Sequence, residues 1–500
     1  MTIIEKLSIL RNHGGAAETK GLDDATINRF AASDVRIGEA VDRALTAFEQ
    51  LKDEYPELLQ ESEAAQIAEL QHGYVNFYPN DAINPYVSLA ARGPWIVTLK
   101  GAVLYECGGY GMLGSGHAPD HVLAAMNQPH VMANIMTPSV SHKRFNEALN
   151  REIGHTRAGG NPFAAMFCLN SGSESVTLAA RISDTNAKLH TDPDGPHAGK
   201  PIRCLGLAGA FHGRTDRPGR FSDSTRKTYL EHLASFRDQD TLLTVEPNNL
   251  EQLQAVFDQA NEDGVFIEAM FLEPVMGEGN PGMAVTPEFY ALARKLTRDM
   301  GTLLLVDSIQ AGLRAHGVLS IVDYPGFQEL DAPDMETYSK AINAGQYPLS
   351  VLAVTADAAE IYRKGTYGNT MTTNPRAMDV AVAVLESLTP ELRQNVADRG
   401  AEMVTKLKAL QDELGGAITQ VQGTGLLVSA ELDPAVYKSY GADSAEEYMR
   451  LHGVNVVHGG ANALRYTPGF GLSSEEVDLM IDATRQALVH GPVKAASEAA

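Results

Sequence analysis

Short apolar runs alternate with longer helical patterns through the middle of this 500-residue chain, and this alternation constrains the fold more than any other feature. Continuous apolar strands separated by helices are typical of a mostly parallel sheet that is covered on both faces. Such sheets bind ligands at the carboxyl ends of their strands. The predicted strands are 164–169, 204–208, 269–272, 303–306 and 349–354, and helices are predicted at 173–189 and 250–260.

The amino-terminal part has a different pattern. Residues 34–51 place apolar side chains near the 3.6-residue period, and 61–70 form a second helical stretch, so a helical extension is expected. Residues 95–99 and 103–107 are rich in β-forming residues on either side of a Lys-Gly turn, which predicts a hairpin.

The carboxyl-terminal part begins with a long helix that is expected after Pro375. Residues 391–490 then alternate helix and strand with antiparallel character. We therefore predict an α/β protein with a large, mostly parallel-sheet domain and a smaller α+β domain. The predicted parts are a helical extension (1–92), the amino-terminal part of the small domain with a connector (93–120), the large domain (121–375) and the carboxyl-terminal small domain (376–500).

Composition narrows the class of protein. The chain has 63 acidic and 40 basic residues and a net charge of −23, which disfavours binding to nucleic acid or to anionic membranes. Glu5 and Lys6 interrupt any signal-peptide core, and no apolar run approaches the roughly 18 residues that span a bilayer. Cys107, Cys168 and Cys204 form no CxxC pair and are interpreted as reduced thiols. We expect a cytoplasmic protein without a metal site.

Two glycine-containing segments follow predicted strands. Residues 170–175 read Asn-Ser-Gly-Ser-Glu-Ser and open a helix, so their backbone N–H groups can point at a phosphate, although an ordinary N-cap explains the same residues. Residues 211–215 read Phe-His-Gly-Arg-Thr. The aromatic ring can stack on a planar cofactor and the arginine can bind a carboxylate; packing of the ring in the core is the alternative.

Acidic residues follow two further strands. Glu273 and Glu278 stand in a Gly/Pro-rich loop that can hold a carboxylate near a site or form a solvated turn. Asp307 follows four consecutive apolar residues, and a buried carboxylate is unfavourable unless it is paired. A protonated pyridine nitrogen would pair it, and so would a structural salt bridge or a helix N-cap.

Lys340 lies among small and apolar residues next to a glycine-containing bend. A desolvated lysine has a lowered pKa and becomes a nucleophile that forms Schiff bases with carbonyl compounds. An exposed loop lysine is the alternative, and no single motif decides between the two.

The order and spacing of these five motifs resemble the class III aminotransferases of the ornithine, acetylornithine and 4-aminobutyrate type, from about residue 97 to about residue 490. The resemblance is closest in the segments NSGSES, AFHGRT, EPVMGEG, LLLVDSIQAG and SKAINAG. It implies the pyridoxal 5′-phosphate (PLP) transferase fold of type I, with PLP as cofactor.

The resemblance also implies roles for individual residues. Lys340 would form the Schiff base and move the proton, and Asp307 would hold the pyridine nitrogen protonated. The other implied cofactor-binding residues are Gly172, Ser173, Phe211, His212, Gln310 and Thr370. The threonine would reach the phosphate of a neighbouring subunit, which implies a homodimer with shared active sites, or a higher oligomer built from it.

Three residues are implied to address the substrate. Arg465 would hold a substrate carboxylate, Glu278 would mask that arginine when an amine donor has no such carboxylate, and Arg214 would contact the distal carboxylate of an acceptor. The implied reaction moves an amino group from an amine or amino acid to a 2-oxo acid such as 2-oxoglutarate or pyruvate.

The chain also departs from the family pattern. Ser308 replaces the usual acidic residue, Thr372 and Thr373 replace a Gly-Gly pair, and the glycine run after Lys340 is missing. These departures leave the substrate and the subfamily open. Racemisation, ammonia- or phospho-lyase elimination and decarboxylation are alternatives on the same fold because they begin from the same Schiff base, and retention of Glu278 and Arg465 favours transamination. A non-catalytic binding module is the third hypothesis, which retention of Lys340 and Asp307 disfavours.

Overall fold

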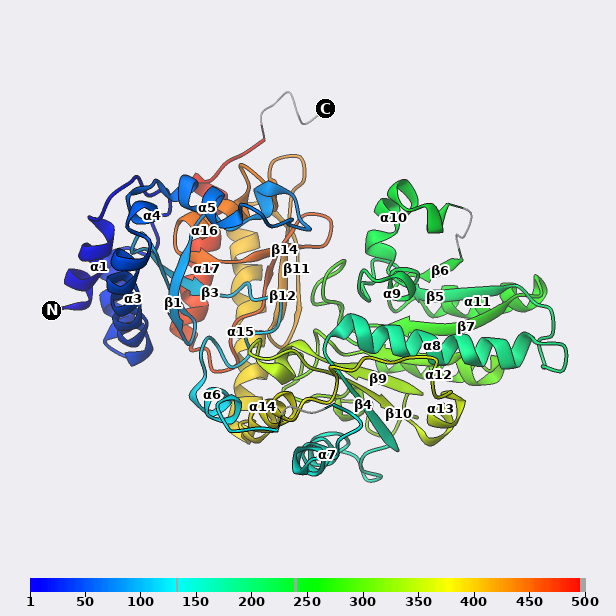
Figure 1. The fold of residues 1–500 in the computed structure, drawn as a ribbon. Coiled ribbons are helices and arrows are strands. Elements are labelled where there is room, and N and C mark those ends of the chain that lie inside the picture. The colour runs from blue at the N-terminus through cyan, green and yellow to red at the C-terminus, as the bar shows by residue number, and fades with distance from the viewer. Residues whose placement is uncertain (132–133, 238–240, 495–500) are drawn as a thin grey trace. The chain divides into compact units, whose positions relative to one another are not determined.

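A computed structural model describes residues 1–131, 134–237 and 241–494 of the chain (Figure 1). The chain divides into two compact units. Unit 1 comprises Met1–Asp120, Asp398–Gln422 and Val428–Ala500, and unit 2 comprises His121–Ala397 and Gly423–Leu427. Among the described residues, no helix is both long and apolar enough to cross a bilayer. The domain boundaries predicted from the sequence stay predictions.

Unit 2 is built on a seven-stranded sheet in the order β4-β10-β9-β8-β7-β5-β6. Strand β10 is antiparallel to both of its neighbours, and the other described pairs, from β9 through to β6, are parallel. The strands are β4 (Ala165–Leu169), β5 (Ile202–Leu207), β6 (Leu242–Val245), β7 (Phe266–Leu272), β8 (Leu303–Asp307), β9 (Met335–Tyr338) and β10 (Ser350–Val354). The predicted mostly parallel sheet is confirmed, and β6 and β9 are additional to the five strands that the sequence predicts.

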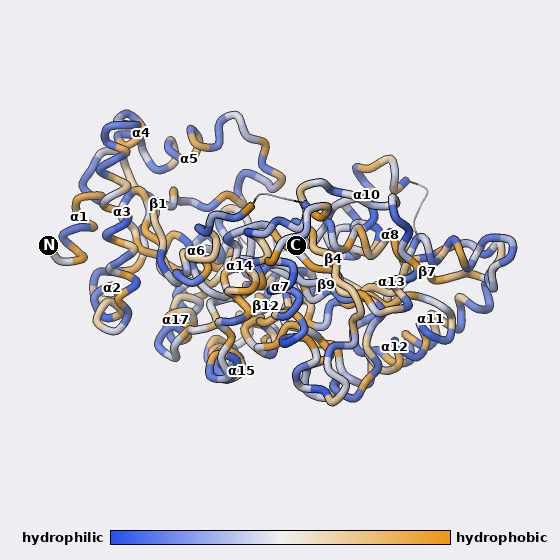
Figure 2. Tube along the Cα trace, turned by 60° about the horizontal axis from the view of Figure 1, so that its bottom comes forward, coloured by the Kyte–Doolittle hydropathy of each residue, from blue (hydrophilic) through white to orange (hydrophobic). Residues whose placement is uncertain are grey.

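The strands of this sheet are buried on both faces. Phe271 and Leu305 belong to the apolar cluster under helix α8 (Gly172–Thr191). The residues before them, Met270 and Leu304, point to the opposite face of the sheet and are fully buried as well. Helices α11 (Leu250–Glu262) and α12 (Pro287–Met300) also pack on the sheet. Figure 2 shows hydrophilic and hydrophobic residues interspersed along both, as an amphipathic helix on a sheet requires.

The remaining helices of unit 2 connect the strands or follow them. They are α7 (Val140–Glu152), α9 (Asp216–Gly219), α10 (Arg226–His232), α13 (Ala356–Ile361), α14 (Pro375–Glu386), and the 3₁₀ turns η2 (Asp223–Thr225), η3 (Ala234–Phe236), η4 (Ile321–Asp323) and η5 (Lys340–Asn343). The helix expected after Pro375 is α14, in which proline occupies the first helical position.

Unit 1 contains two four-stranded sheets. The first has the order β1-β2-β3-β13, and the second has the order β11-β12-β15-β14 with β15 antiparallel to both β12 and β14. The strands are β1 (Ser88–Arg92), β2 (Trp95–Thr98), β3 (Val103–Glu106), β11 (Ile418–Thr424), β12 (Leu427–Leu432), β13 (Val454–Asn455), β14 (Val457–Gly459) and β15 (Ala463–Tyr466). The predicted hairpin is confirmed as β2 and β3, which are antiparallel.

The amino-terminal helices of unit 1 pack on the first sheet through α3 (Val35–Glu54). This helix begins after Asp34, whose carboxylate accepts the Arg36 N–H at 3.0 Å and the Trp95 indole N–H at 2.7 Å, and its apolar stripe is buried. The other helices of this unit are α1 (Ile3–Arg11), α2 (Asp24–Ala31), α4 (Pro56–Gln60), α5 (Glu63–Gln71), η1 (Asn80–Ala82), α16 (Ala445–Leu451) and α17 (Ser474–His490). Two further helices, α6 (Asp120–Met126) and α15 (Pro390–Leu414), contain residues of both units.

Candidate active site

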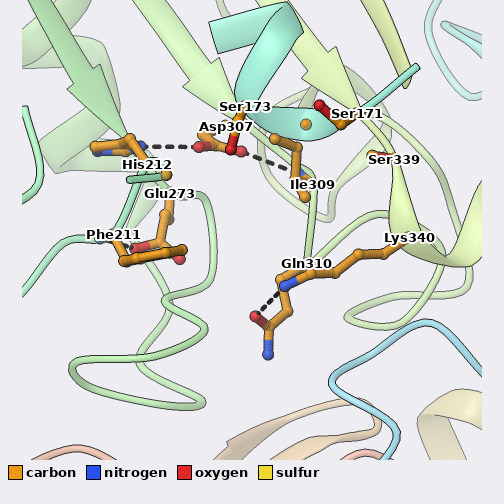
Figure 3. A pocket seen from close by; sticks show the side chains of 12 residues that line it. Ser171, Ser173, Phe211, His212, Glu273, Asp307, Ile309, Gln310, Ser339 and Lys340 are labelled. Carbon is orange, nitrogen blue, oxygen red and sulfur yellow. Dashed lines mark hydrogen bonds and ion pairs between the residues drawn. The ribbon is translucent and has the colours of Figure 1, made fainter. Parts of the chain in front are cut away.

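A cavity of about 190 Å³ lies in unit 2 where the strands β5, β7, β8 and β9 end and where α8 begins (Figure 3). This is the edge of the sheet at which α/β proteins bind their ligands. The lining residues are Ser171, Gly172, Ser173, Phe211, His212, Gly213, Glu273, Asp307, Ile309, Gln310, Ser339 and Lys340. All five sequence motifs therefore contribute residues to one cavity, and the motif at 273–279 contributes Glu273.

The first turn of α8 forms one wall of the cavity. Ser171 is the N-cap, and its hydroxyl accepts the Glu174 N–H at 3.3 Å. The N–H groups of a first helical turn have no carbonyl one turn earlier, so they are suited to an anion. The backbone approaches closely here because Gly213, at φ +111°, has no Cβ; a Cβ would lie 2.8 Å from the Ser173 hydroxyl oxygen. The arrangement fits a phosphate group.

Asp307 ends β8 and is buried, with 4% of its surface exposed. Its Oδ2 lies 2.8 Å from His212 Nδ1, and its Oδ1 accepts the Ile309 N–H at 3.2 Å. Among the residues that the structure describes, no arginine or lysine forms a salt bridge with it, and His212 Nε2 is buried without a hydrogen-bond partner. A buried carboxylate with this surrounding is suited to a cationic ligand.

Lys340 follows β9 and faces the same cavity. Its backbone has φ +46°, in the left-handed region that lysine rarely adopts and that is enriched at functional sites. Its half-buried Nζ donates a hydrogen bond to Gln310 Oε1 at 2.7 Å. The geometry holds a primary amine inside the cavity with a defined direction.

Phe211 and Glu273 form the wall opposite the lysine (Figure 3). The Phe211 N–H donates to Glu273 Oε1 at 3.0 Å. Burial raises the pKa of Glu273 to about 7, an effect that His212 opposes and Asp307 reinforces. From the sequence, no individual role was expected for this carboxylate. Like Asp307, however, Glu273 directly follows an apolar strand, and that position indicates a buried carboxylate.

Arg214 and Glu278, two predicted substrate residues, form an ion pair with 3.4 Å between Nη2 and Oε1. Both side chains are partly exposed, at 46% and 34%. The Arg214 guanidinium also lies 5.2 Å from the centre of the Phe211 ring. The pair therefore stands beside the aromatic residue of the cavity and is open to solvent.

Two other predicted residues do not line the cavity. Thr370 is exposed in the segment before α14. Arg465 belongs to unit 1, where it lies in β15, is 3% exposed and has its guanidinium 5.5 Å from the Tyr110 ring centre. Ser171, Gly213, Ile309 and Ser339 line the cavity without having been assigned individually from the sequence.

Comparison with known proteins agrees with this geometry. Residues 78–488 match the family model described as aminotransferase class-III. The chain belongs to the class III aminotransferases. This enzyme is 25% identical to the ornithine aminotransferase of Saccharomyces cerevisiae over 405 residues, 80% of this chain and 92% of that protein. It is 31% identical to the acetylornithine aminotransferase of Xylella fastidiosa over 274 residues, 54% of this chain and 62% of that protein.

Solved structures share the fold of this class III aminotransferase. The ornithine aminotransferase of Toxoplasma gondii, whose structure is described with PLP at partial occupancy in its active site, superposes with a TM-score of 0.72 at 21% identity, covering 88% of this chain and 97% of that one. The acetylornithine aminotransferase of Elizabethkingia anophelis gives 0.67 at 20% identity, with 85% and 99% covered. The predicted type I fold is confirmed, and the class III aminotransferase is a PLP-dependent enzyme that transfers an amino group.

The residues of the cavity fit this cofactor. PLP presents a phosphate, an aromatic ring with a protonatable nitrogen and an aldehyde carbon. The cavity provides a helix N-terminus, an aromatic side chain, a buried carboxylate without an arginine or lysine partner in the described residues, and a lysine amine. Each chemical group of the cofactor therefore has a counterpart on the chain.

Proposed function

We propose that Lys340 is the lysine to which PLP is covalently attached and that Asp307 pairs with the ring nitrogen. The observation that supports both roles is the presence of the Lys340 amine and the Asp307 carboxylate in a single cavity that also contains the first turn of α8. Bound PLP supplies an electron sink for removal of a proton from the carbon that bears the amino group.

Other residues of the cavity bind the phosphate, pack against the ring and orient the lysine. Gly172 and Ser173 bind the phosphate through backbone N–H groups and a hydroxyl, and Phe211 packs against the ring. Gln310 accepts a hydrogen bond from the Lys340 amine and fixes its direction. Lys340 then removes and returns the proton on the reacting carbon as a general base and acid.

Peptide mapping tests the attachment. Loading the enzyme with PLP, reducing it with borohydride and digesting it should give a phosphopyridoxyl mass on the peptide that contains Lys340. Lys340→Ala should remove this mass and lower the rate of amino transfer by about 10²–10⁴-fold or more. The exposed Lys364 provides the matched control, since Lys364→Ala should change neither. Label on another lysine in the wild-type enzyme would refute the assignment.

We also propose the substrate class. The relatives are named for ornithine, acetylornithine and [LysW]-aminoadipate semialdehyde transamination, which supports an ω-amine of a diamino acid or its derivative as the donor. The acceptor is a 2-oxo acid, 2-oxoglutarate or pyruvate, with Arg214 and Arg465 as its carboxylate ligands and Glu278 as the residue that masks Arg465. The exposed Arg214–Glu278 pair supports the role of Arg214, because it places a cation next to the aromatic wall of the cavity.

A single-turnover experiment tests this reaction. An ω-amine donor should convert the bound cofactor to its pyridoxamine form, and 2-oxoglutarate or pyruvate should restore the original absorbance. A panel of ornithine, N-acetylornithine and 4-aminobutyrate ranks the donors. Release of free ammonia without interconversion of the two cofactor forms would contradict transamination and favour elimination.

We further propose a cytoplasmic homodimer whose active sites are completed across the subunit boundary. Thr370 is exposed and does not line the cavity, and its neighbour Met371 is 69% exposed, which fits a segment that contacts a second copy. The three cysteines form no disulfide, which fits a reducing compartment.

Subunit mixing tests the shared site. Lys340→Ala and Thr370→Asp homodimers should both be inactive, and a mixed dimer should regain activity because one of its sites contains the native lysine and the partner's native threonine. Failure of the mixed dimer to regain activity, while Thr370→Asp alone is inactive, would show that the threonine acts within its own subunit.

A further inference from the structure

Two buried glutamates, one in strand β7 and one directly after it, have different partners. Glu268, inside the strand, is 2% exposed and accepts hydrogen bonds from Arg217 Nη2 at 2.9 and 3.0 Å. Glu273, directly after the strand, is 4% exposed and accepts two backbone N–H groups instead, from Phe211 at 3.0 Å and from Gly277 at 2.8 Å. Each of its oxygens is therefore used by a different loop of the cavity.

The first of these hydrogen bonds leads to Asp307. The residue after Phe211 is His212, whose N–H donates to the Ser222 hydroxyl at 2.9 Å and whose Nδ1 lies 2.8 Å from Asp307 Oδ2. The loop after β5 and the end of β8 are not neighbours in the sheet, because β7 lies between them. Glu273 directly follows that middle strand and accepts the N–H of Phe211, the residue before His212.

The second hydrogen bond leads to Lys340. The Gly277 carbonyl accepts a long hydrogen bond of 3.4 Å from Gln310 Nε2, and Gln310 Oε1 accepts the Lys340 amine at 2.7 Å. The approach of Gly277 to Gln310 leaves no room for a side chain, since a Cβ on the glycine would lie 2.5 Å from Gln310 Oε1. The Gly277 backbone thus contacts the glutamine that accepts the hydrogen bond of the lysine.

We propose that Glu273 is a positioning residue that fixes, through the backbone amides of Phe211 and Gly277, the relative placement of the Asp307 and Lys340 ends of the cofactor site. This inference rests on the roles proposed above for Asp307 and Lys340. A carboxylate suits the task because both of its oxygens accept hydrogen bonds, whereas a glutamine amide has one accepting oxygen and would turn its NH₂ group toward the second N–H. The titratable groups that face Glu273 are His212 and Asp307.

The matched pair Glu273→Gln and Glu268→Gln separates positioning from stability. Each variant replaces a buried carboxylate in or directly after β7 by its isosteric amide, and of the two residues only Glu273 lines the cavity. The measurements on full-length enzyme are the dissociation constant of PLP from the apoenzyme, the absorbance spectrum of the bound cofactor with its pH midpoint, and the thermal unfolding midpoint. We expect Glu273→Gln to weaken PLP binding by roughly tenfold or more, because one buried amide loses its acceptor, and to shift the spectrum or its pH midpoint.

The control should respond in the opposite way. Glu268→Gln should lower the unfolding midpoint and leave the PLP dissociation constant and the spectrum as in the wild type. A wild-type dissociation constant and spectrum for Glu273→Gln would overturn the inference, and so would equal changes in both variants. If Glu273→Gln does not fold, Glu273→Asp replaces it: the shorter carboxylate cannot reach both amides, so a change of the same direction is expected and an unchanged spectrum and affinity refute the inference.

Borohydride labelling keeps this result apart from the proposed function. If the wild-type enzyme is not labelled at Lys340, the proposed attachment fails, and the inference falls with it. If the wild type is labelled and Glu273→Gln binds PLP as the wild type does, only the positioning role fails.

Discussion

Buried carboxylates at the cavity end of the strands and buried carboxylates away from it have different hydrogen-bond partners. Away from the cavity, Glu268 accepts two hydrogen bonds from Arg217, and Asp334, just before β9, accepts two from Arg294 at 2.8 Å each. At the cavity, Asp307 has a histidine and a backbone N–H as partners. Within the described ranges, no arginine or lysine forms a salt bridge with the cavity carboxylates.

This difference separates structure from function. An arginine in a two-point pair satisfies a buried carboxylate permanently, so the pair stabilises the fold and is unavailable to a ligand. A buried carboxylate without such a partner is unfavourable in the free protein and favourable once a cation binds. The contrast predicts that changes at the cavity alter catalysis, and that changes at the remote pairs alter stability.

Removal of the charge at the cavity should have the largest effect on activity. Asp307→Asn keeps the shape of the side chain but no longer favours a protonated ring nitrogen, so we expect kcat to fall by about 10²–10³-fold. The thermal unfolding midpoint of the apoenzyme should change little, because no salt bridge to an arginine or lysine of the described residues is broken. Steady-state kinetics and calorimetry on the same preparation measure both, and a kcat within a factor of two of the wild type would contradict the role of Asp307.

Breaking a remote pair should give the reverse pattern. Arg294 is 6% exposed, and Arg294→Met leaves Asp334 without its cation, so unfolding should become easier by about 3 kcal/mol. Chemical denaturation measures this loss. The kcat and the PLP affinity, measured well below the unfolding midpoint, should match those of the wild type. A large loss of PLP affinity would contradict the prediction that this pair affects stability alone.

The sheet and most of the cavity could be predicted from the sequence because apolar strands leave a local signal. Strand β9 could not, since only two of its four residues are apolar and its Glu336 is buried through hydroxyl donors, Ser308 Oγ at 2.6 Å and Ser320 Oγ at 2.5 Å. Those donors lie 28 and 16 residues away in the chain, and nothing in the local pattern reveals that they satisfy a carboxylate.

The site shows the same limit. The order of the motifs suggested that Lys340, Asp307 and Phe211 act together, and the structure brings them to one cavity. The role of Glu273 could not be derived in this way, because its partners are backbone amides that any residue could supply. Side-chain chemistry can be read from a sequence, while a hydrogen bond from the backbone of one loop to a side chain of another needs the structure.

Glu336 extends the comparison to a carboxylate that is buried in the sheet without an arginine. Burial raises its pKa from 4.5 to about 7, against the opposing effect of its hydroxyl partners. Because the folded-state pKa is raised, its contribution to stability is complete below about pH 4.5 and is lost as the pH rises to about 7. This shift corresponds to a loss on the order of 3 kcal/mol.

Urea denaturation of apoenzyme between pH 4.5 and 7.5 tests this contribution. The stability difference between the wild type and Glu336→Gln should fall by about 2–3 kcal/mol as the pH rises across this range. His316, whose pKa burial lowers to about 4, has the opposite pH dependence but is present in both proteins and cancels in the difference. A difference that does not vary with pH would mean that Glu336 stays in one protonation state throughout.

The smallest effect is expected where a carboxylate of the cavity loop does have an arginine, at the exposed Arg214–Glu278 pair. An exposed pair of this kind contributes about 0.2–1 kcal/mol, so Glu278→Gln should leave the unfolding midpoint nearly unchanged. If Arg214 contacts the acceptor, the substrate carboxylate no longer competes with Glu278 for the guanidinium in this variant. The KM for 2-oxoglutarate should therefore fall up to about fivefold at similar kcat. Asp216→Asn, at another exposed carboxylate paired with Arg220 in the same unit, is the matched control and should leave that KM unchanged. An unchanged KM in Glu278→Gln together with a reduced kcat would instead place Glu278 in the chemical step, and the pair would then belong with Asp307 on the catalytic side of the comparison.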